Sequence, residues 1–154
     1  MTGLRVKNTL NPNELMPFVE RTPGNVNWYI CGPTVYAPSH VGHARAYLTF
    51  DIIRGILEEY FGYNVTYCMN ITDIDDKIIR RAMERGEEPL TLAQRYIDAF
   101  YRDTDALGLA RPDAEPRVST SMEAIISMIE RLIERGHAYE ADGSVWFSVK
   151  SFPE

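Results

Sequence analysis

Residues 28–34, Trp28-Tyr29-Ile30-Cys31-Gly32-Pro33-Thr34, decide the fold of this chain. Trp28, Tyr29 and Ile30 are aromatic or β-branched, and such residues favour a short buried strand. Gly32-Pro33 is a strong turn signal, so the strand is expected to end at Cys31. The residues that follow Cys31 are therefore predicted to lie on a loop at the carboxyl end of a strand.

A helix and a second strand are predicted after this loop. Ser39 is expected to cap the helix and Gly62 to end it. Asn64–Met69 is typical of a second strand, and a strand–helix–strand unit places its two strands parallel. We therefore predict an α/β chain, a Rossmann-like nucleotide-binding half-domain with parallel strands and flanking helices. The residues that recur at helical spacing and should face the core are Val41, Ala44, Leu48, Ile52, Ile53, Leu57 and Tyr60.

Three more helices and a hairpin are predicted downstream. Lys77–Arg85 favours a short helix closed by Gly86. Two capping boxes are expected to open the other helices, and Asp142-Gly143 is a hairpin signal. Short strands are also predicted at Leu4–Thr9 and Arg117–Ser119. The two capping boxes are Thr91 with Gln94 and Thr120 with Glu123.

Composition and charge narrow the functional class. The 154 residues are 45% hydrophobic and 25% charged, as in ordinary globular proteins. No signal peptide or membrane span is expected, and two cysteines, Cys31 and Cys68, disfavour a disulfide framework. A cytoplasmic location without membrane contact follows as an expectation. The net charge of −6 shows no diffuse attraction to nucleic-acid phosphates in this segment.

Two loops are expected to converge on one crevice, because ligands of parallel sheets bind beyond the carboxyl ends of the strands. The first strand delivers Cys31-Gly32-Pro33-Thr34 and then His40-Val41-Gly42-His43. The second strand delivers Asn70–Asp76. An acidic calcium loop is excluded there, because Ile78 occupies the position that requires glycine. Capping of the next helix by Asp75 or Asp76 is the better interpretation.

His40 and His43 share one face at the start of a helix, where exposed backbone donors favour an anion. Gly42 carries no side chain that would keep a nucleotide away from the backbone. The pattern fits phosphate binding, and a pair of histidines making local hydrogen bonds is the alternative.

Cys31 has two interpretations. Its thiolate could ligate zinc or act as a nucleophile, whereas a small buried hydrophobe is the common fate of a free cysteine. A complete zinc site within this chain is not expected, because Cys68 and the three histidines show no zinc-finger spacing.

Taken together, 29–36, 40–45 and 70–77 resemble the amino-terminal signature of cysteinyl-tRNA synthetases, with features closest to eukaryotic cytosolic members. The resemblance implies a class I synthetase that activates L-cysteine with ATP and magnesium and transfers it to tRNA(Cys). It also implies that residues 1–136 are an incomplete half of the catalytic domain and 137–154 the start of a connective insertion. The isolated chain is then expected to be inactive, and it could self-associate.

The resemblance also implies roles for individual residues. His40, Gly42 and His43 match the signature that holds ATP phosphates, with the two histidines acting in catalysis. Cys31 matches a zinc ligand that binds the substrate thiolate, and a metal separates cysteine from serine better than an apolar pocket does. Gly32 and Thr72 match residues that line the cysteine pocket. The alternatives are a cysteine ligase of mycothiol biosynthesis and a non-catalytic nucleotide-binding or interaction fragment.

Overall fold

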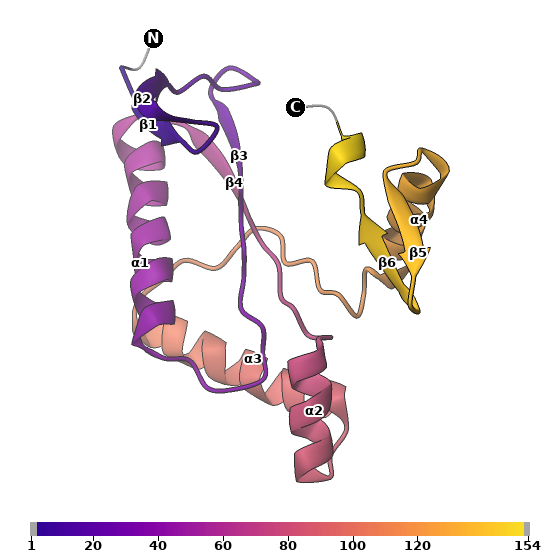
Figure 1. Cartoon of the computed structure of the whole chain (residues 1–154). Helices are drawn as coiled ribbons and strands as arrows, with labels where there is room; N and C mark the ends of the chain where they lie inside the picture. The colour runs from indigo at the N-terminus through magenta and orange to yellow at the C-terminus, as the bar shows by residue number, and fades with distance from the viewer. Residues whose placement is uncertain (1–2, 153–154) are drawn as a thin grey trace. The chain divides into compact units, whose positions relative to one another are not determined.

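Two parallel strands, β3 (Asn25–Ile30) and β4 (Asn64–Met69), form the centre of the first part of the chain. The structure is a computed structural model that describes residues 3–152, and it divides into two compact units between Pro116 and Arg117. The strands pair from Asn25 opposite Asn64 to Ile30 opposite Met69. The predicted pair of parallel strands is confirmed (Figure 1). Cys31 follows β3 directly.

The helical crossover between the strands is α1 (Val41–Gly55), which continues as a π-helical turn, η1 (Ile56–Tyr60). Gly62 follows with a positive φ of 70°, as expected for a residue that ends a helix. The predicted core face is wrong in part. Leu57 is buried, but Val41, Ile52, Ile53 and Tyr60 are exposed.

Aromatic residues of α1 take the place of that predicted face. Tyr47 is buried, and Phe50 packs edge-on against Tyr47 and against Trp28 of β3. Tyr47 also packs edge-on against Phe100. Aromatic rings bury more area than the aliphatic side chains they replace, so they determine which face of α1 turns inward.

Two helices, α2 (Asp76–Arg85) and α3 (Pro89–Ala106), follow β4. The Asp75 side chain accepts a hydrogen bond of 2.8 Å from the Lys77 N–H, which confirms the predicted cap of α2. Gly86 adopts the left-handed conformation that ends this helix. The capping box predicted at Thr91 is wrong, because Pro89 begins α3 two residues earlier and its fixed φ suits the first helical position.

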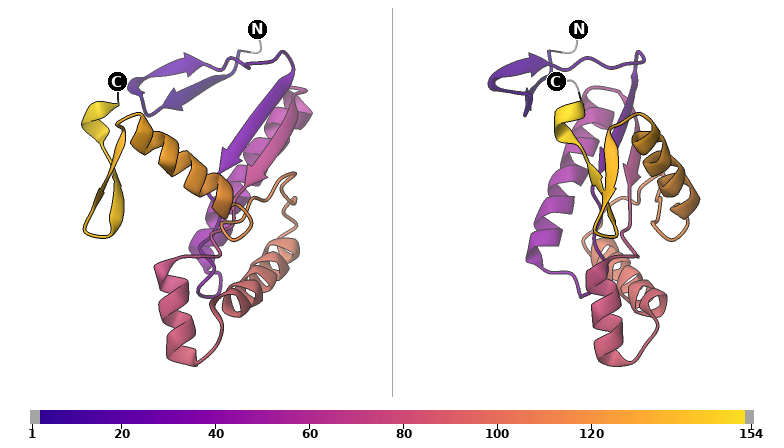
Figure 2. Two further views of the ribbon diagram at one scale, coloured as in Figure 1. Left: turned by 90° about the vertical axis from the view of Figure 1, so that its right-hand side faces the viewer. Right: turned by 45° about the vertical axis from the view of Figure 1, so that its right-hand side comes forward.

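A hairpin of β1 (Arg5–Asn8) and β2 (Asn11–Pro17) begins the described part of the chain. A strand within Leu4–Thr9 is confirmed. Its partner β2 was not predicted, because the segment Asn11–Pro17 has two prolines and little apolar alternation. Figure 2 shows this hairpin near the end of α1, away from the loops that follow β3 and β4.

The second unit contains α4 (Met122–Glu134), the antiparallel strands β5 (Ala138–Ala141) and β6 (Ser144–Phe147), and a short 3₁₀ turn, η2 (Val149–Ser151). The predicted hairpin is confirmed, and Asp142 and Gly143 both have positive φ, as its tight turn requires.

Two predictions for the second unit are wrong. Of the strand predicted at Arg117–Ser119, only Arg117 takes part in an isolated β-bridge, and residues 118–120 form a turn. Ser121 is the N-cap of α4, and its side chain makes no capping bond. The Thr120 hydroxyl donates to the Arg117 carbonyl at 3.3 Å, so the predicted capping box is replaced by a local turn. The predicted division into residues 1–136 and 137–154 stays a prediction. Its outer ends, residues 1–2 and 153–154, lie outside the part of the chain that the structure describes.

The half-buried Arg54 of α1 contacts several other segments of the first unit. Its Nε lies 3.0 Å from Glu58 Oε1, and its two Nη atoms lie 3.1 Å from the Arg111 carbonyl oxygen and 3.4 Å from Asp113 Oδ2. The guanidinium also lies over the Tyr67 ring of β4. Arg54 therefore ties α1 to β4 and to the loop that follows α3.

We expect Arg54→Ala to lower the free energy of unfolding by about 2 kcal/mol, because several hydrogen bonds to a partly buried charge are lost together. Arg54→Lys should give an intermediate loss of unfolding free energy, since lysine keeps the charge but lacks the planar guanidinium that donates several hydrogen bonds at once. The measurement is urea unfolding followed by circular dichroism. Arg81→Ala is the control, because its pair with Glu84 is exposed and long at 3.9 Å, and it should cost less than about 0.5 kcal/mol. Equal losses of unfolding free energy in Arg54→Ala and Arg81→Ala would contradict the structural role given to Arg54.

Candidate active site

The loops that follow β3 and β4 lie side by side in the structure. The Thr72 N–H donates to the Pro33 carbonyl at 3.1 Å, and the Val35 N–H donates to the Thr72 carbonyl at 3.2 Å. Thr34 and Thr72 thus form a parallel bridge just beyond the strand pair. The predicted convergence of the two loops is confirmed, and it brings Cys31, Gly32 and Thr72 to the same end of the sheet.

Gly32 of the first loop lies directly against Asn70 of the second. A Cβ atom built on Gly32 would lie 1.6 Å from the Asn70 carbonyl oxygen. The Gly32 N–H donates to the side-chain Oδ1 of Asn70 at 2.9 Å. Glycine is required here because no other side chain fits between the two backbones.

Cys31 is exposed, so the interpretation as a small buried hydrophobe is wrong for this residue. Its carbonyl oxygen accepts from the Tyr47 hydroxyl at 3.4 Å, and its thiol lies 3.6 Å from the Gly32 carbonyl oxygen. Cys68 is half-buried within β4. The Cys31 sulfur is therefore accessible at the edge of the loop pair.

A zinc ion would need four ligands, and Cys31 is a chemically suitable one. Among residues 3–152, however, no group of three or more histidine, cysteine, aspartate or glutamate side chains is arranged to hold a metal ion.

His40 and His43 form the start of α1. His40 is the N-cap, and its Nδ1 accepts from the Gly42 N–H at 3.1 Å. The Nδ1 of His43 in turn accepts from the His40 N–H at 3.2 Å, and the two rings stack with centroids 4.0 Å apart. The predicted cap at Ser39 is wrong, because the imidazole of His40 already satisfies the backbone donor that Ser39 would bond.

These hydrogen bonds fix the chemistry of the two imidazoles. A ring nitrogen that accepts from a backbone N–H carries no proton, so each neutral ring has its proton on Nε2. Burial and the neighbouring His40 both lower the pKa of His43, which keeps its ring neutral near pH 7. Two Nε2–H donors are thus available beside the first turn of α1, where the helix dipole favours negative charge.

A pocket of about 360 Å³ lies beside these histidines. One wall is the start of α1, with His40, His43 and Ala44, and the other is the second half of α3, with Phe100 and Asp103. The lining of this pocket does not include Cys31, Gly32 or Thr72. The predicted convergence on one crevice is therefore confirmed for the paired loops of Cys31 and Thr72, whereas the histidines line a pocket that does not include them.

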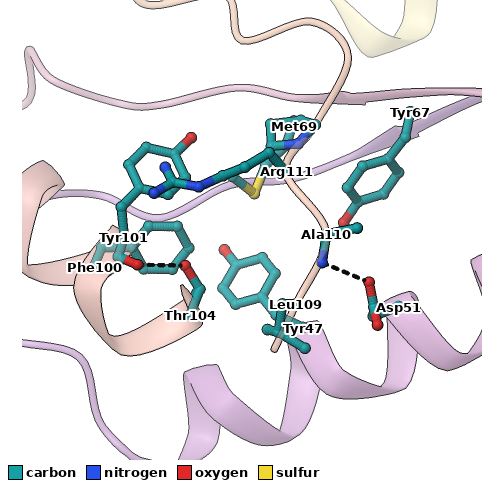
Figure 3. A pocket seen from close by; sticks show the side chains of 11 residues that line it. Tyr47, Asp51, Tyr67, Met69, Phe100, Tyr101, Thr104, Leu109, Ala110 and Arg111 are labelled. Atoms are coloured by element: carbon teal, nitrogen blue, oxygen red, sulfur yellow. Dashed lines mark hydrogen bonds between the residues drawn. The ribbon is translucent and has the colours of Figure 1, made fainter. Parts of the chain in front are cut away.

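Tyr47 connects the two parts of the site. Its ring lies 6.5 Å from the His43 ring in a stacked orientation, and its hydroxyl reaches the Cys31 carbonyl. Figure 3 shows Tyr47 beside Phe100 and Thr104 in a small pocket of about 20 Å³. Burial, followed by the nearby Cys31 and Tyr67, raises the pKa of Tyr47 far above its usual value, so its hydroxyl stays protonated and able to donate.

Two residues of this region, Tyr47 and Asn70, were missed as site residues by sequence reasoning. Tyr47 lies at a position where an aromatic residue normally indicates only the core. Asn70 directly follows β4, and a polar residue at the carboxyl end of a parallel strand is the signal that could have found it.

A family model described as the class I (C) tRNA synthetase catalytic domain matches residues 17–154. The chain belongs to this family. Its Rossmann-type α/β fold is also that of solved class I synthetases. A Mycobacterium tuberculosis methionyl-tRNA synthetase bound by methionyl-adenylate matches with a TM-score of 0.62 at 21% identity, over 86% of this chain and 30% of that one. An Agrobacterium radiobacter LeuRS in complex with tRNA and LeuAMS matches with a TM-score of 0.65 at 23% identity, over 77% of this chain and 16% of that one.

Curated relatives share about half of their aligned residues with this synthetase-family chain. A cysteine–tRNA ligase of Trichlorobacter lovleyi is 52% identical over 151 residues, which cover 98% of this chain and 31% of the relative. The cysteine–tRNA ligase of Burkholderia multivorans is 52% identical over 153 residues, with 99% and 32% covered. The chain thus spans about a third of the length of these relatives, which are bacterial rather than eukaryotic.

No helix within 3–152 has the length and apolar character needed to cross a membrane.

Proposed function

We propose that this chain provides the phosphate-binding and amino-acid-binding loops of a cysteine–tRNA ligase. The observation that carries the proposal is the start of α1, where the Nδ1 atoms of His40 and His43 accept the capping hydrogen bonds and their Nε2 atoms are left as donors. In such an enzyme ATP and L-cysteine give cysteinyl-adenylate and pyrophosphate, and tRNA(Cys) then accepts the cysteinyl group.

The phosphate part of the proposal follows from electrostatics. In adenylation the cysteine carboxylate attacks the α-phosphorus of ATP, and negative charge shifts onto the departing pyrophosphate. Hydrogen-bond donors that are already oriented stabilise such charge without reorganising. His40 and His43 are proposed to supply these donors from Nε2, with Gly42 leaving the backbone open to the nucleotide. Magnesium, bound to the ATP phosphates, would neutralise further charge.

The amino-acid part rests on the paired loops. Cys31, Gly32 and Thr72 are proposed to contact the substrate cysteine, because hydrogen bonds between the loops bring all three to one end of the sheet. Cys31 is further proposed as one thiolate ligand of a zinc ion that would select sulfur over oxygen. The exposed position of its thiol supports this role.

The relatives favour a tRNA ligase over the cysteine ligase of mycothiol biosynthesis, since the Trichlorobacter and Burkholderia proteins carry the former name and match nearly the whole of this chain. A non-catalytic nucleotide-binding fragment shares the phosphate site but requires no selectivity for cysteine. Ligand selectivity therefore separates the last alternative from the proposal.

Calorimetric titration of the purified chain tests the proposal with two ligands, magnesium-ATP and a non-hydrolysable cysteinyl-sulfamoyl adenosine. His40→Asn and His43→Gln are designed to keep the helix caps, because asparagine at the N-cap and glutamine three residues later both serve that role. Each removes an imidazole donor to the phosphates, so we expect each to weaken the binding of magnesium-ATP roughly tenfold, which corresponds to one hydrogen bond to a charged group, and to affect the analogue less, because it lacks the β- and γ-phosphates.

The third histidine, His137, lies in the second unit and provides the control. His137→Asn should leave both affinities within about twofold of wild type. Sulfamoyl adenosine, which lacks the cysteinyl group, should bind more weakly than the cysteinyl analogue. A folded wild-type chain that binds neither ligand, or histidine variants that bind both normally, would overturn the proposed function.

A further inference from the structure

Asn70 joins the two loops of the candidate site through three side-chain hydrogen bonds. Its Oδ1 accepts from the Gly32 N–H at 2.9 Å and from the Tyr29 hydroxyl at 2.8 Å. Its Nδ2 donates to the Thr72 hydroxyl at 3.3 Å. One half-buried amide therefore contacts the end of β3, the loop that follows it, and the loop that follows β4.

The orientation of this amide is determined by its partners. A backbone N–H can only donate, so the atom facing Gly32 must be the carbonyl oxygen of the amide. The amide nitrogen then faces Thr72, whose hydroxyl can accept. Both atoms of the amide are used, so a leucine or an alanine at this position would leave the Gly32 N–H without its acceptor.

The contact between Gly32 and Asn70 also fixes the spacing of the loops. The Asn70 carbonyl occupies the place where a Gly32 side chain would lie, and the Asn70 side chain bonds the Gly32 nitrogen. The same residue thus touches Gly32 with both its main chain and its side chain. Loss of the Asn70 side chain is therefore expected to move Gly32 relative to Thr72.

We propose that Asn70 is a positioning residue for amino-acid selection, which sets the distance between the loop of Cys31 and Gly32 and the loop of Thr72. The inference rests on the proposed function and deepens it. Asn70 acts through Gly32 and Thr72, and it is separate from the histidine pocket, whose lining does not include it. Its effect therefore falls on the aminoacyl part of a ligand and not on the phosphates.

The test uses the full chain with Asn70→Ala and Asn70→Asp. The alanine variant loses all three hydrogen bonds and should weaken the binding of cysteinyl-sulfamoyl adenosine at least tenfold, while the affinity for magnesium-ATP stays within about twofold. Aspartate keeps acceptors for the Gly32 N–H and the Tyr29 hydroxyl, so it should restore most of the analogue affinity. If Asn70 had only a structural role, Asn70→Ala would weaken the binding of both ligands to a similar extent.

Hydrogen exchange of the Gly32 amide, followed by NMR, provides a readout that needs no ligand. It should become faster in Asn70→Ala and return toward the wild-type rate in Asn70→Asp. Unchanged exchange in the alanine variant, or equal losses for the two ligands, would overturn the inference. A wild-type chain that binds neither ligand would instead overturn the proposed function, and with it the selection role of Asn70.

Discussion

Replacing Gly32 with alanine is expected to lower the free energy of unfolding by about 3 kcal/mol and to abolish binding of the cysteinyl-adenylate analogue. The new Cβ would lie 1.6 Å from a backbone oxygen, that of Asn70, which cannot rotate away as a flexible side chain could. The loops must separate, and the hydrogen bonds between Thr72 and its partners in 33–35 are lost. Urea unfolding and calorimetric titration measure the two effects.

Gly55→Ala is the matched control for this prediction. A Cβ on Gly55 would meet no atom within 4 Å, and Gly55 lies at the end of α1 with helical dihedrals. Alanine should therefore stabilise the chain by up to about 1 kcal/mol, because glycine is the weaker helix former. A Gly32→Ala variant with wild-type stability and affinity would show that the loops are not held as closely as the structure indicates.

The second large effect is expected for Phe100→Ala, which should cost about 3–4 kcal/mol of unfolding free energy. Phe100 of α3 is buried and packs edge-on against Tyr47 and Tyr101, with centroid distances of 5.2 and 5.3 Å. Removing the ring leaves a cavity between α1 and α3 and removes support from Tyr47. Thermal or urea unfolding monitored by circular dichroism measures the loss.

Leu90 provides the comparison on the same helix. It lies in the first turn of α3 with 53% of its surface exposed, so Leu90→Ala should cost less than about 1 kcal/mol. Phe100→Leu should fall between the two, since leucine fills part of the cavity. Similar losses at positions 90 and 100 would contradict the assignment of Phe100 to the core.

The sequence was sufficient for β3, β4 and the hairpin of β5 and β6 because their signals are local, whereas β2 lacks such a signal. Asn64–Met69 is an apolar, β-branched and aromatic run, and glycines mark where several helices end. The three helix starts marked by Ser39, Thr91 and Thr120 were misplaced. At Ser39 the neighbouring His40 caps the helix, and at Thr91 a proline starts the helix earlier. At Thr120 the hydroxyl bonds the Arg117 carbonyl in a local turn. Such competition depends on geometry that a four-residue pattern does not contain.

The candidate site was predicted at the level of loops but not of individual contacts. His40, His43, Cys31, Gly32 and Thr72 were identified by their places after strands and at a helix start. Asn70 and Tyr47 act through residues on another element, over separations of 38 and 16 positions. Pairings of this kind depend on the packing of the whole unit, and spacing along the chain does not reveal them.

The two histidines at the start of α1 are constrained in two ways at once, by the folding of the helix and by the proposed ligand binding. In each histidine the ring nitrogen that makes the capping bond and the one left as a donor belong to the same side chain, so most substitutions are expected to damage folding and the proposed ligand binding together. Asparagine at position 40 and glutamine at position 43 are among the few changes that separate these effects. Mutational drift through this segment is therefore expected to be slow, and a variant that has lost its ligand could still keep the histidines for the sake of its fold.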